Sequence, residues 1–239
     1  MQPTGAIFAA LDCDADAIEQ WNRWYDLEHT PPNVLLDGVM LSRRYVAPPE
    51  LHAARVAAEG SPFAGGRATF LTIYTLTGDP GIAFDAMSTT LPKLHAGGRM
   101  TFPSEKKVVR DGDVFTEDTA TSDPATQMES NEVPFVGHTG IVVVQRQGGE
   151  PSPERADKVV ELAGVYGVWT LRSVNRPGLS LDLTFVEGDA GERARAIRVQ
   201  APYADDVDVV VDAPYELINP LHYPWADAIR ASDLPATIA

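Results

Sequence analysis

The sequence has little positive charge and almost no cysteine. Its 239 residues include 19 Lys and Arg against 34 Asp and Glu, which gives a formal net charge of -15. Proteins that hold nucleic acid or an anionic membrane surface use clustered basic side chains, so this balance argues against both kinds of partner. The single cysteine, Cys13, cannot form an internal disulfide, and the apolar run over residues 5–11 is too short for a membrane span or a signal. We therefore expect a soluble protein of the cytoplasm.

Sequence motifs for cofactors and metals are also missing. Neither G-x-G-x-x-G after a strand nor G-x-x-x-x-G-K-[ST] occurs, and the Cys/His spacing fits no zinc motif. A metal site of His29, His95 and a carboxylate can be imagined, but no short-range ligand pair such as H-x-x-x-H supports it. The five histidines do not single out an axial ligand for haem. We predict that the chain uses no metal and no cofactor.

A polar segment divides the chain into two similar halves. Residues 117–134 are rich in Pro, Ser, Thr and acidic side chains and show no apolar periodicity, which is typical of a linker. We therefore predict three parts: a first repeat over residues 1–116, a linker over 117–134, and a second repeat over 135–239.

Three short sequence matches occur in the same order in both halves. They pair residues 5–10 with 140–144, 38–43 with 167–172, and 76–81 with 186–191. In the second match, glycine, valine and arginine coincide without a gap, so that Arg43 corresponds to Arg172. Internal similarity of this kind indicates a duplicated structural unit.

Each half has the pattern of a β-α-β-β-α-β unit, in which apolar runs of strand length alternate with helical segments. In the first half, strands are expected near residues 5–11, 38–46, 67–77 and 107–116, and helices near 15–28 and 80–95. In the second half, strands are expected near 137–147, 167–174, 179–187 and 206–217, and helices near 153–165 and 190–199. This order predicts two tandem ferredoxin-like repeats of the α+β class.

The two clearest predicted strands carry no charged side chain on either face. From Ala68 to Leu76 neither alternating set of side chains is charged, and Ile141 to Val144 is continuously apolar. Strands of this kind are buried on both sides. Because the helices of each repeat cover one face, we expect the two antiparallel sheets to face each other as an α+β barrel, whose interior holds one small ligand.

The segment from Ile18 to Tyr45 carries the sharpest motif. Its first part, W-x-x-W-Y-D-x-E-H-x-P, places aromatic side chains on one helical face and His29 at the helix end, and the two prolines that follow should stop the helix there. A Gly-Val pair then leads into a strand with Arg43, Arg44 and Tyr45. We expect the helix end and this strand to be neighbours in space.

This pattern resembles the EthD-like branch of the dimeric α+β barrel superfamily. The resemblance implies a barrel protein acting on a small aromatic or polyketide-like molecule, and the family's activities include cyclases, dehydratases, decarboxylases, isomerases, quinone-forming monooxygenases and haem-handling enzymes. In the second half, residues 154–161 replace the motif helix, so the resemblance extends to one site and not to two equal ones. Superfamily members commonly pair their sheets, which makes a homodimer possible, although duplication can satisfy this pairing within one chain.

Four residues are the candidates for catalysis: His29, Arg43, Tyr45 and His95. An imidazole titrates near neutral pH, so His29 is the first candidate for acid–base work and His95 the second. A histidine at a helix end can instead only stabilise the helix dipole. Arg43 and Tyr45 share one strand face and could stabilise an oxyanion, although arginines in so acidic a protein can equally pair with surface carboxylates.

The candidates for substrate binding are Trp21, Tyr25, Arg44, Tyr74, Trp169 and Arg172. Trp21 and Tyr25 are more often part of a helix-to-sheet core, whereas Tyr74 and Trp169 on strands have the better claim to line a cavity. Arg43 and Arg44 point to opposite strand faces, so only one of them faces the barrel.

We interpret the chain as an enzyme of the lyase or isomerase type, which moves a proton in a small, partly apolar molecule without a cofactor. One alternative is a cofactor-free, quinone-forming monooxygenase on the same barrel, which oxygen consumption would reveal. The other is a non-catalytic small-molecule-binding or stress-response module, which would retain a ligand without turning it over.

Overall fold

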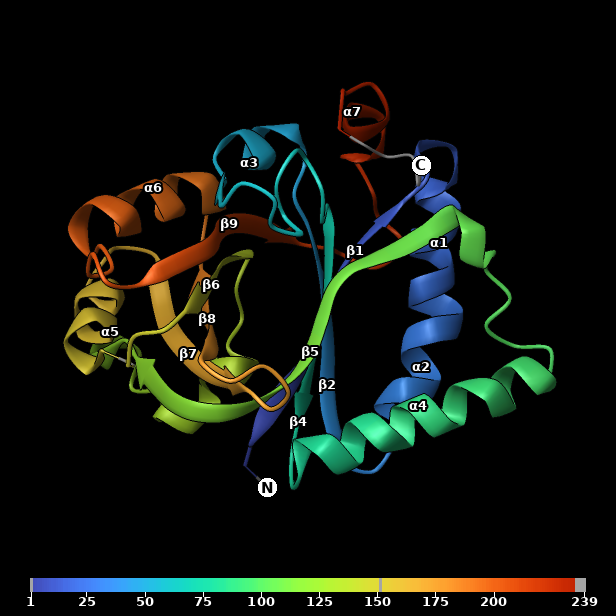
Figure 1. The fold of residues 1–239 in the computed structure, drawn as a ribbon, viewed down its shortest axis with the longest axis horizontal. Helices are drawn as coiled ribbons and strands as arrows, with labels where there is room; N and C mark the ends of the chain where they lie inside the picture. Colours follow the sequence, from blue (N-terminus) through green and yellow to red (C-terminus); the bar gives the residue numbers. More distant parts are fainter. Residues whose placement is uncertain (1, 151, 235–239) are drawn as a thin grey trace.

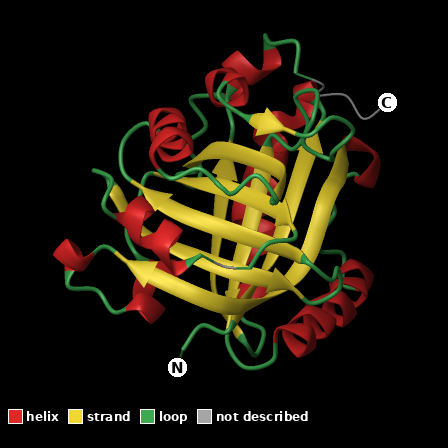
Figure 2. Cartoon of the chain, turned by 60° about the vertical axis from the view of Figure 1, so that its left-hand side comes forward, coloured by secondary structure: helices red, strands yellow, loops and turns green. Residues whose placement is uncertain are grey.

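The central feature of the fold is an antiparallel sheet that closes into a barrel (Figures 1 and 2). The computed structural model describes residues 2–150 and 152–234. The strand order is β2-β4-β1-β5-β7-β8-β6-β9-β3, and an additional pairing of β2 with β9 closes every strand except β3 into a ring. Helices surround this ring on its outer face, as Figure 2 shows.

Both halves of the chain contain the predicted β-α-β-β-α-β order. The first contains β1 (Gly5–Cys13), α1 (Ile18–Trp24), a π-helical turn (Tyr25–His29), α2 (Thr30–Val34), β2 (Val39–Val46), α3 (Pro49–Ala53), β3 (Val56–Ala57), β4 (Phe70–Leu76), α4 (Pro80–Ala96) and β5 (Lys107–Ser122). The second contains β6 (Gly140–Gln147), α5 (Pro153–Val160), β7 (Val165–Ser173), β8 (Leu179–Val186), α6 (Ala190–Gln200) and β9 (Asp208–Leu217), followed by α7 (Ala226–Arg230). Short 3-10 turns cover Ala15–Ala17, Ser104–Lys106, Pro124–Thr126 and Ser130–Phe135. The predicted α+β class and tandem ferredoxin-like repeats are confirmed.

The two repeats join edge to edge. Within each repeat the first strand lies between the third and the fourth, so that β1 lies between β4 and β5, and β6 lies between β8 and β9. The fourth strand of each repeat then pairs with the second strand of the other, which gives the junctions β5–β7 and β9–β2. These two junctions leave neither repeat with a free long edge.

The segment over residues 117–134 is more ordered than its composition predicts. β5 continues to Ser122 and pairs with β7, with Ala120 opposite Trp169. Glu117 accepts a hydrogen bond of 2.8 Å from the Trp169 indole, and Val133 is fully buried in the barrel core. A polar side chain can belong to a strand when one face of that strand meets water, so composition alone was a poor guide here. The first part of the predicted linker is thus a strand, while the division of the chain at residues 116 and 135 stays a prediction.

The interior of the barrel is a packed core. Large side chains from both repeats meet there, and each of these is at most 1% exposed: Phe8, Tyr45, Phe115, Trp169 and Tyr215. A barrel of about eight strands has an interior just wide enough for side chains to fill. The expected ligand cavity inside the barrel is therefore wrong, and a binding site has to lie between the barrel wall and its helices or at a barrel end.

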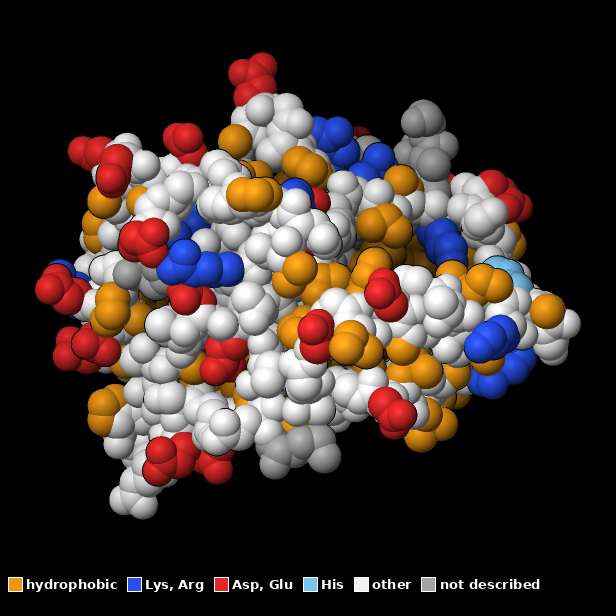
Figure 3. All heavy atoms as spheres, turned by 60° about the horizontal axis from the view of Figure 1, so that its bottom comes forward, with side chains coloured by type: hydrophobic (Ala, Val, Ile, Leu, Met, Phe, Trp, Pro, Cys, Tyr) orange, Lys and Arg blue, Asp and Glu red, His pale blue; other side chains and the backbone are white. Residues whose placement is uncertain are grey.

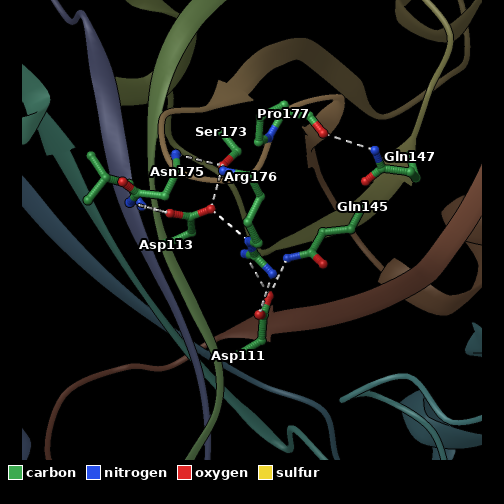
Figure 4. A network of polar contacts seen from close by, with 9 residues as sticks. Asp111, Asp113, Gln145, Gln147, Ser173, Asn175, Arg176 and Pro177 are labelled. Carbon is green, nitrogen blue, oxygen red and sulfur yellow. Dashed lines mark hydrogen bonds and ion pairs between the residues drawn. The ribbon is translucent and has the colours of Figure 1, made fainter.

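A charged network fills one end of the barrel interior (Figure 4). Arg176, after β7, donates 2.8 Å hydrogen bonds to Asp111 Oδ1 and to Asp113 Oδ2, both on β5. Gln145 of β6 donates to Asp111 at 2.6 Å. Burial acts to raise the pKa of Asp113, but hydrogen bonds from Ser173, Arg176 and Asn175 lower it below its usual value. The network ties the last strand of the first repeat to the second repeat.

We expect Arg176→Met to destabilise the fold by about 2 kcal/mol at neutral pH, because two buried carboxylates lose a charged donor. Asp113 has a lowered pKa in the folded state, so its contribution is present above the pKa of the unfolded chain and is lost as the pH falls through the folded value. The difference in the free energy of unfolding between wild type and variant, measured by urea denaturation, should therefore shrink between pH 7 and about pH 3. Arg195→Met, at an exposed position of α6, is the control. If the difference in unfolding free energy between wild type and Arg176→Met did not change with pH, the role given to Asp113 would be contradicted.

The helices cover the outer face of the barrel in two groups (Figure 1). The α1–α2 helix and α4 lie on the first repeat, and α5 and α6 lie on the second. In the described part of the chain, no helix is both long and apolar enough to cross a membrane.

Candidate functional site

The motif helix is interrupted by a π-helical turn. α1 continues through Tyr25–His29 into α2 without a break, whereas the sequence suggested an end after His29. Pro31 and Pro32 lie in the first turn of α2, where a missing N–H costs little, so they do not stop the helix. Single π turns in helices are frequent at functional sites. This turn carries most of the residues that the motif singled out.

His29 is held between aromatic rings and keeps one ring nitrogen free. Its ring centroid lies 4.8 Å from that of Trp24 and 4.4 Å from that of Tyr25. The Asn33 amide nitrogen lies 3.4 Å from Nε2, and the same amide donates to the Tyr74 hydroxyl at 3.3 Å. Nε2 then accepts, so that Nδ1 carries the ring hydrogen. Nδ1 is buried and has no hydrogen-bond partner among the described residues.

The surroundings of His29 keep it neutral. Burial, and then the nearby charges of Lys107 and Arg44, lower the pKa of His29 to about 3. At physiological pH the ring is therefore a neutral hydrogen-bond donor and not an imidazolium, as in enzymes that polarise a carbonyl with a neutral imidazole. From the sequence we expected His29 to transfer a proton in acid–base catalysis. Its environment in the structure favours a neutral ring that donates a hydrogen bond instead.

Lys107 is a charged neighbour that sequence reasoning missed. It stands at the start of β5 opposite Cys13, on the face of the sheet that meets the helices. Its Nζ lies 4.3 Å from the Trp24 ring centroid, and no ion pair joins it to a described carboxylate. Burial lowers the pKa of Lys107 below its usual value. A desolvated lysine is a recognised general base, but one Lys in a polar stretch gives no signal in the sequence.

An open groove, here called the first-repeat groove, lies between the motif helix, α4 and the outer face of the sheet. Ala9 in central β1 is only partly buried, although its neighbours along the strand are buried. Its partner Gly112 is exposed, and Val109 on the same strand is 60% exposed. These strand positions form an apolar floor on the side of the sheet that meets the helices, where Lys107 and His29 both contact Trp24.

Helix α4 does not cover this floor. Its inward stripe is buried at Ala83, near the N-terminal end, but Met87 and Leu94 further along are only partly buried. Figure 1 shows the C-terminal part of α4 standing away from the sheet. Figure 3, which brings the lower side of Figure 1 forward, shows a hollow with hydrophobic side chains at its bottom and charged side chains nearby. The groove is therefore open to a ligand from solvent.

Arg44 and Asp26 form a buried ion pair on the other side of the motif helix. Their charged atoms are 3.0 Å apart, and the side chains are 5% and 7% exposed. The Arg44 guanidinium lies 4.2 Å from the Tyr25 ring centroid and 5.4 Å from that of Trp21. The Tyr223 hydroxyl donates to Asp26 at 2.5 Å, which attaches the C-terminal segment. Arg44, Trp21 and Tyr25 thus hold the motif helix on the sheet, and a cavity of about 320 Å³ adjoins Arg44.

Arg43 and Tyr45 lie on the opposite face of β2, at one end of the barrel interior. Arg43 donates to the carbonyl oxygens of Val136 and Phe135 at 2.9 and 3.0 Å. The Tyr45 hydroxyl lies 3.0 Å from Nε2 of His138, whose Nδ1 lies 2.8 Å from the Val136 carbonyl. Burial lowers the pKa of His138 to about 4. Arg43 therefore fastens the connection between the repeats, on the face of the sheet away from the motif helix.

Arg172 is not the structural counterpart of Arg43. Arg43 pairs with Ile73 of β4, and Leu183, at the corresponding position of β8, pairs with Trp169. The sequence match was therefore displaced by three residues, and an odd displacement turns a side chain to the other face. Arg172 lies outside, with Asp118 and Glu150 at 3.0 and 2.7 Å. The predicted correspondence of Arg43 with Arg172 is therefore wrong.

The remaining predicted site residues divide between the two faces of the sheet. Trp169 is enclosed in the barrel core, and Tyr74 lies on the helix side, bound to Asn33. His95 is exposed near the end of α4. No group of three or more His, Cys, Asp or Glu side chains that could hold a metal ion occurs within residues 2–150 and 152–234. Of the predicted catalytic residues, His29 is the one that packs against Trp24 on the motif helix.

No protein-family model matches the chain, and no curated protein sequence matches it either. Solved structures do. A chlorite dismutase-like protein aligns over 96% of this chain and 98% of its own at 9% identity, with a TM-score of 0.55. A monooxygenase-like protein from Fusobacterium nucleatum aligns over 90% of this chain and 91% of its own at 9% identity, with a TM-score of 0.49. An anthrone oxidase-like protein aligns over 91% of this chain and 92% of its own at 11% identity, with a TM-score of 0.45. At 9% identity the likeness to the chlorite dismutase-like protein, whose TM-score is above 0.5, shows the fold alone, a ferredoxin-like α+β barrel, and the EthD-like branch stays a prediction.

Proposed function

We propose that the chain is an enzyme of the lyase or isomerase type that binds a small aromatic or polyketide-like ketone in the first-repeat groove and stabilises its enolate. One observation supports this above the others. A neutral His29, with a free buried N–H, stands near Lys107, a lysine with a lowered pKa and no carboxylate partner among the described residues. Both groups contact the Trp24 ring, and a neutral donor and a desolvated amine are the two groups that enolisation requires.

In the proposed reaction Lys107, in its amine form, takes the proton from the carbon next to the substrate carbonyl. The electron pair of that C–H bond moves to the carbonyl oxygen, where the His29 Nδ1–H donates a hydrogen bond to the enolate. The Lys107 ammonium then returns the proton, either to another carbon, which completes an isomerisation, or to a departing hydroxyl, which completes a dehydration. Trp24 and the apolar floor hold the ring of the substrate. Arg43, Arg44 and Tyr45 have no role in these steps because their side chains are engaged elsewhere.

The test is exchange of the α-hydrogens of 2-tetralone, an enolisable aromatic ketone, in deuterium oxide. The wild-type protein should accelerate the exchange, and Lys107→Met should lose at least about a hundredfold of that rate. His29→Gln should lose about ten- to a thousandfold, as a lost oxyanion donor does. Because the amine form of Lys107 acts as the base, the rate should rise with pH through the lowered pKa of Lys107.

Two variants of α4 provide matched controls: Lys93→Met and His95→Asn change exposed groups of the same types. Both should exchange the ketone at the wild-type rate. Lys107→Met turnover equal to that of wild type would remove the proposed base. Oxygen uptake with an electron-rich phenol, without ketone exchange, would instead indicate a monooxygenase, and ligand retention without either reaction would indicate a binding module.

A further inference from the structure

A second cavity lies in the other repeat, where the sequence motif is absent. It has a volume of about 530 Å³, within the range of about 300 to 1,000 Å³ that small-molecule sites occupy. Its floor is the outer face of β6, β7 and β8, and its sides come from α5 and from the segment after α6. The residues used below to define this second-repeat cavity are Arg146, Arg155, Val168, Thr170 and Tyr203.

Arg146 enters the floor of the cavity with part of its charge unsatisfied. It is 2% exposed, and its Nε donates to Asp182 Oδ2 at 3.2 Å. Its Nη1 donates to the carbonyl oxygens of Gly148 and Gly149 at 3.3 and 3.1 Å. A guanidinium has five N–H groups, and these bonds leave Nη2 without an acceptor in the described chain. Arg146 lines the cavity, so its Nη2 is available to an oxygen from a ligand or from water.

Two further donors face the same space. Arg155 of α5 lies with its guanidinium carbon 3.5 Å from the Tyr203 ring centroid, and its Nε donates to Ala201 O at 2.9 Å. This leaves both Nη groups of Arg155 without an acceptor among the residues described. Thr170 of β7 is 6% exposed, and its hydroxyl has no hydrogen-bond partner in the described structure. The planar fork of an arginine matches the two oxygens of a carboxylate.

The other residues that line the cavity limit which anionic ligands can bind there. Asp182 Oδ2 accepts from Arg146 Nε and from the Tyr203 hydroxyl, whereas Asp182 Oδ1 is buried and has no hydrogen-bond partner among the described residues. Glu150, Glu154 and Asp206 also border the cavity, so a ligand with several negative charges would be repelled. Val168, which is 2% exposed, and Tyr203 supply apolar surface beside the donors. A single negative charge on an apolar body can meet the Arg146, Arg155 and Thr170 donors with the least repulsion from the carboxylates that border the cavity.

We propose that the second-repeat cavity binds a small monocarboxylic acid with an apolar body, whose carboxylate accepts hydrogen bonds from Arg146 Nη2, the Arg155 Nη groups and the Thr170 hydroxyl. This site is separate from the first-repeat groove, because the two lie on different repeats and share no residue. It would give the chain a second ligand, distinct from the ketone proposed above.

Isothermal titration calorimetry with three probes tests the proposal: benzoate, 2-naphthoate and hexanoate. At least one should bind with a Kd below about 10 mM, and its neutral amide should bind at least about tenfold more weakly. Arg155→Gln should weaken the carboxylate by about ten- to a hundredfold, and Thr170→Val by a smaller factor. Both variants remove groups that are not part of the Arg146–Asp182 pair, which limits the risk of unfolding.

Two control variants locate the site. Arg195→Gln changes an exposed arginine of α6 and should leave the Kd unchanged. Lys107→Met should also leave it unchanged, and a loss there would place the carboxylate in the first-repeat groove and overturn the proposal. Equal binding of acid and amide, no binding of any probe, or an unchanged Kd in Arg155→Gln would each overturn it as well. None of these outcomes depends on ketone exchange, so the two proposals can fail separately.

Discussion

Replacing Arg44 with methionine is expected to lower the free energy of unfolding by about 3–5 kcal/mol, because the change leaves Asp26 buried without its partner. Both side chains are almost enclosed, and the guanidinium also stacks on Tyr25. Urea denaturation measures the loss. The double variant Arg44→Met/Asp26→Leu should recover most of it, because a buried pair can be replaced by apolar side chains at little cost.

Arg43→Met is the matched control for this prediction. Arg43 is the next residue on the same strand, but it is half-buried and its acceptors include the carbonyl oxygens of Val136 and Phe135. Its loss should cost about 1–2 kcal/mol. An Arg44→Met protein as stable as wild type would show that the ion pair does not hold the motif helix on the sheet.

Replacing Trp169 with alanine is expected to cost about 3–5 kcal/mol, as truncations of buried aromatic side chains do. Trp169 is fully buried in the barrel and donates a hydrogen bond to Glu117. A barrel with a ligand cavity would tolerate the truncation, since the side chain would border empty space. Thermal and urea unfolding distinguish the two cases.

Val174→Ala, just after β7, is the comparison for this truncation. Val174 is 51% exposed, so its change should cost less than about 0.5 kcal/mol. If Trp169→Ala were equally mild, the filled interior would be contradicted.

The order of strands and helices could be predicted from the sequence because it rests on local signals. Apolar runs of strand length mark β1, β4, β6 and β8 in the sequence. In the structure, the side chains of Asp79 and Asp189 cap α4 and α6. The pairing of Leu76 with Val186 as repeat equivalents also agrees with the strand register. These features depend on neighbours along the chain and need no knowledge of the tertiary structure.

The candidate site could be predicted only in part, because it depends on the face of the sheet to which each strand side chain points. The Gly-Val-Arg match was displaced by three residues, which was enough to put Arg43 and Arg172 on opposite faces. Lys107 and His138 gave no signal, since neither belongs to a recognisable motif. His29 was identified from its motif, but its neutral state follows from burial, and burial is a tertiary property.

The two junctions between the repeats have a consequence for assembly. Each junction is a pair of edge strands, β5 with β7 and β9 with β2, and only the segment between Ser122 and Gly140 connects the halves covalently. A half on its own would present two unpaired edges, and such edges attract other strands. The same junctions can form between the first half of one molecule and the second half of another, because the strands involved are identical. We therefore expect the length of the connecting segment to influence the balance between a closed monomer and a domain-swapped dimer, and shortening this segment should favour the swapped dimer.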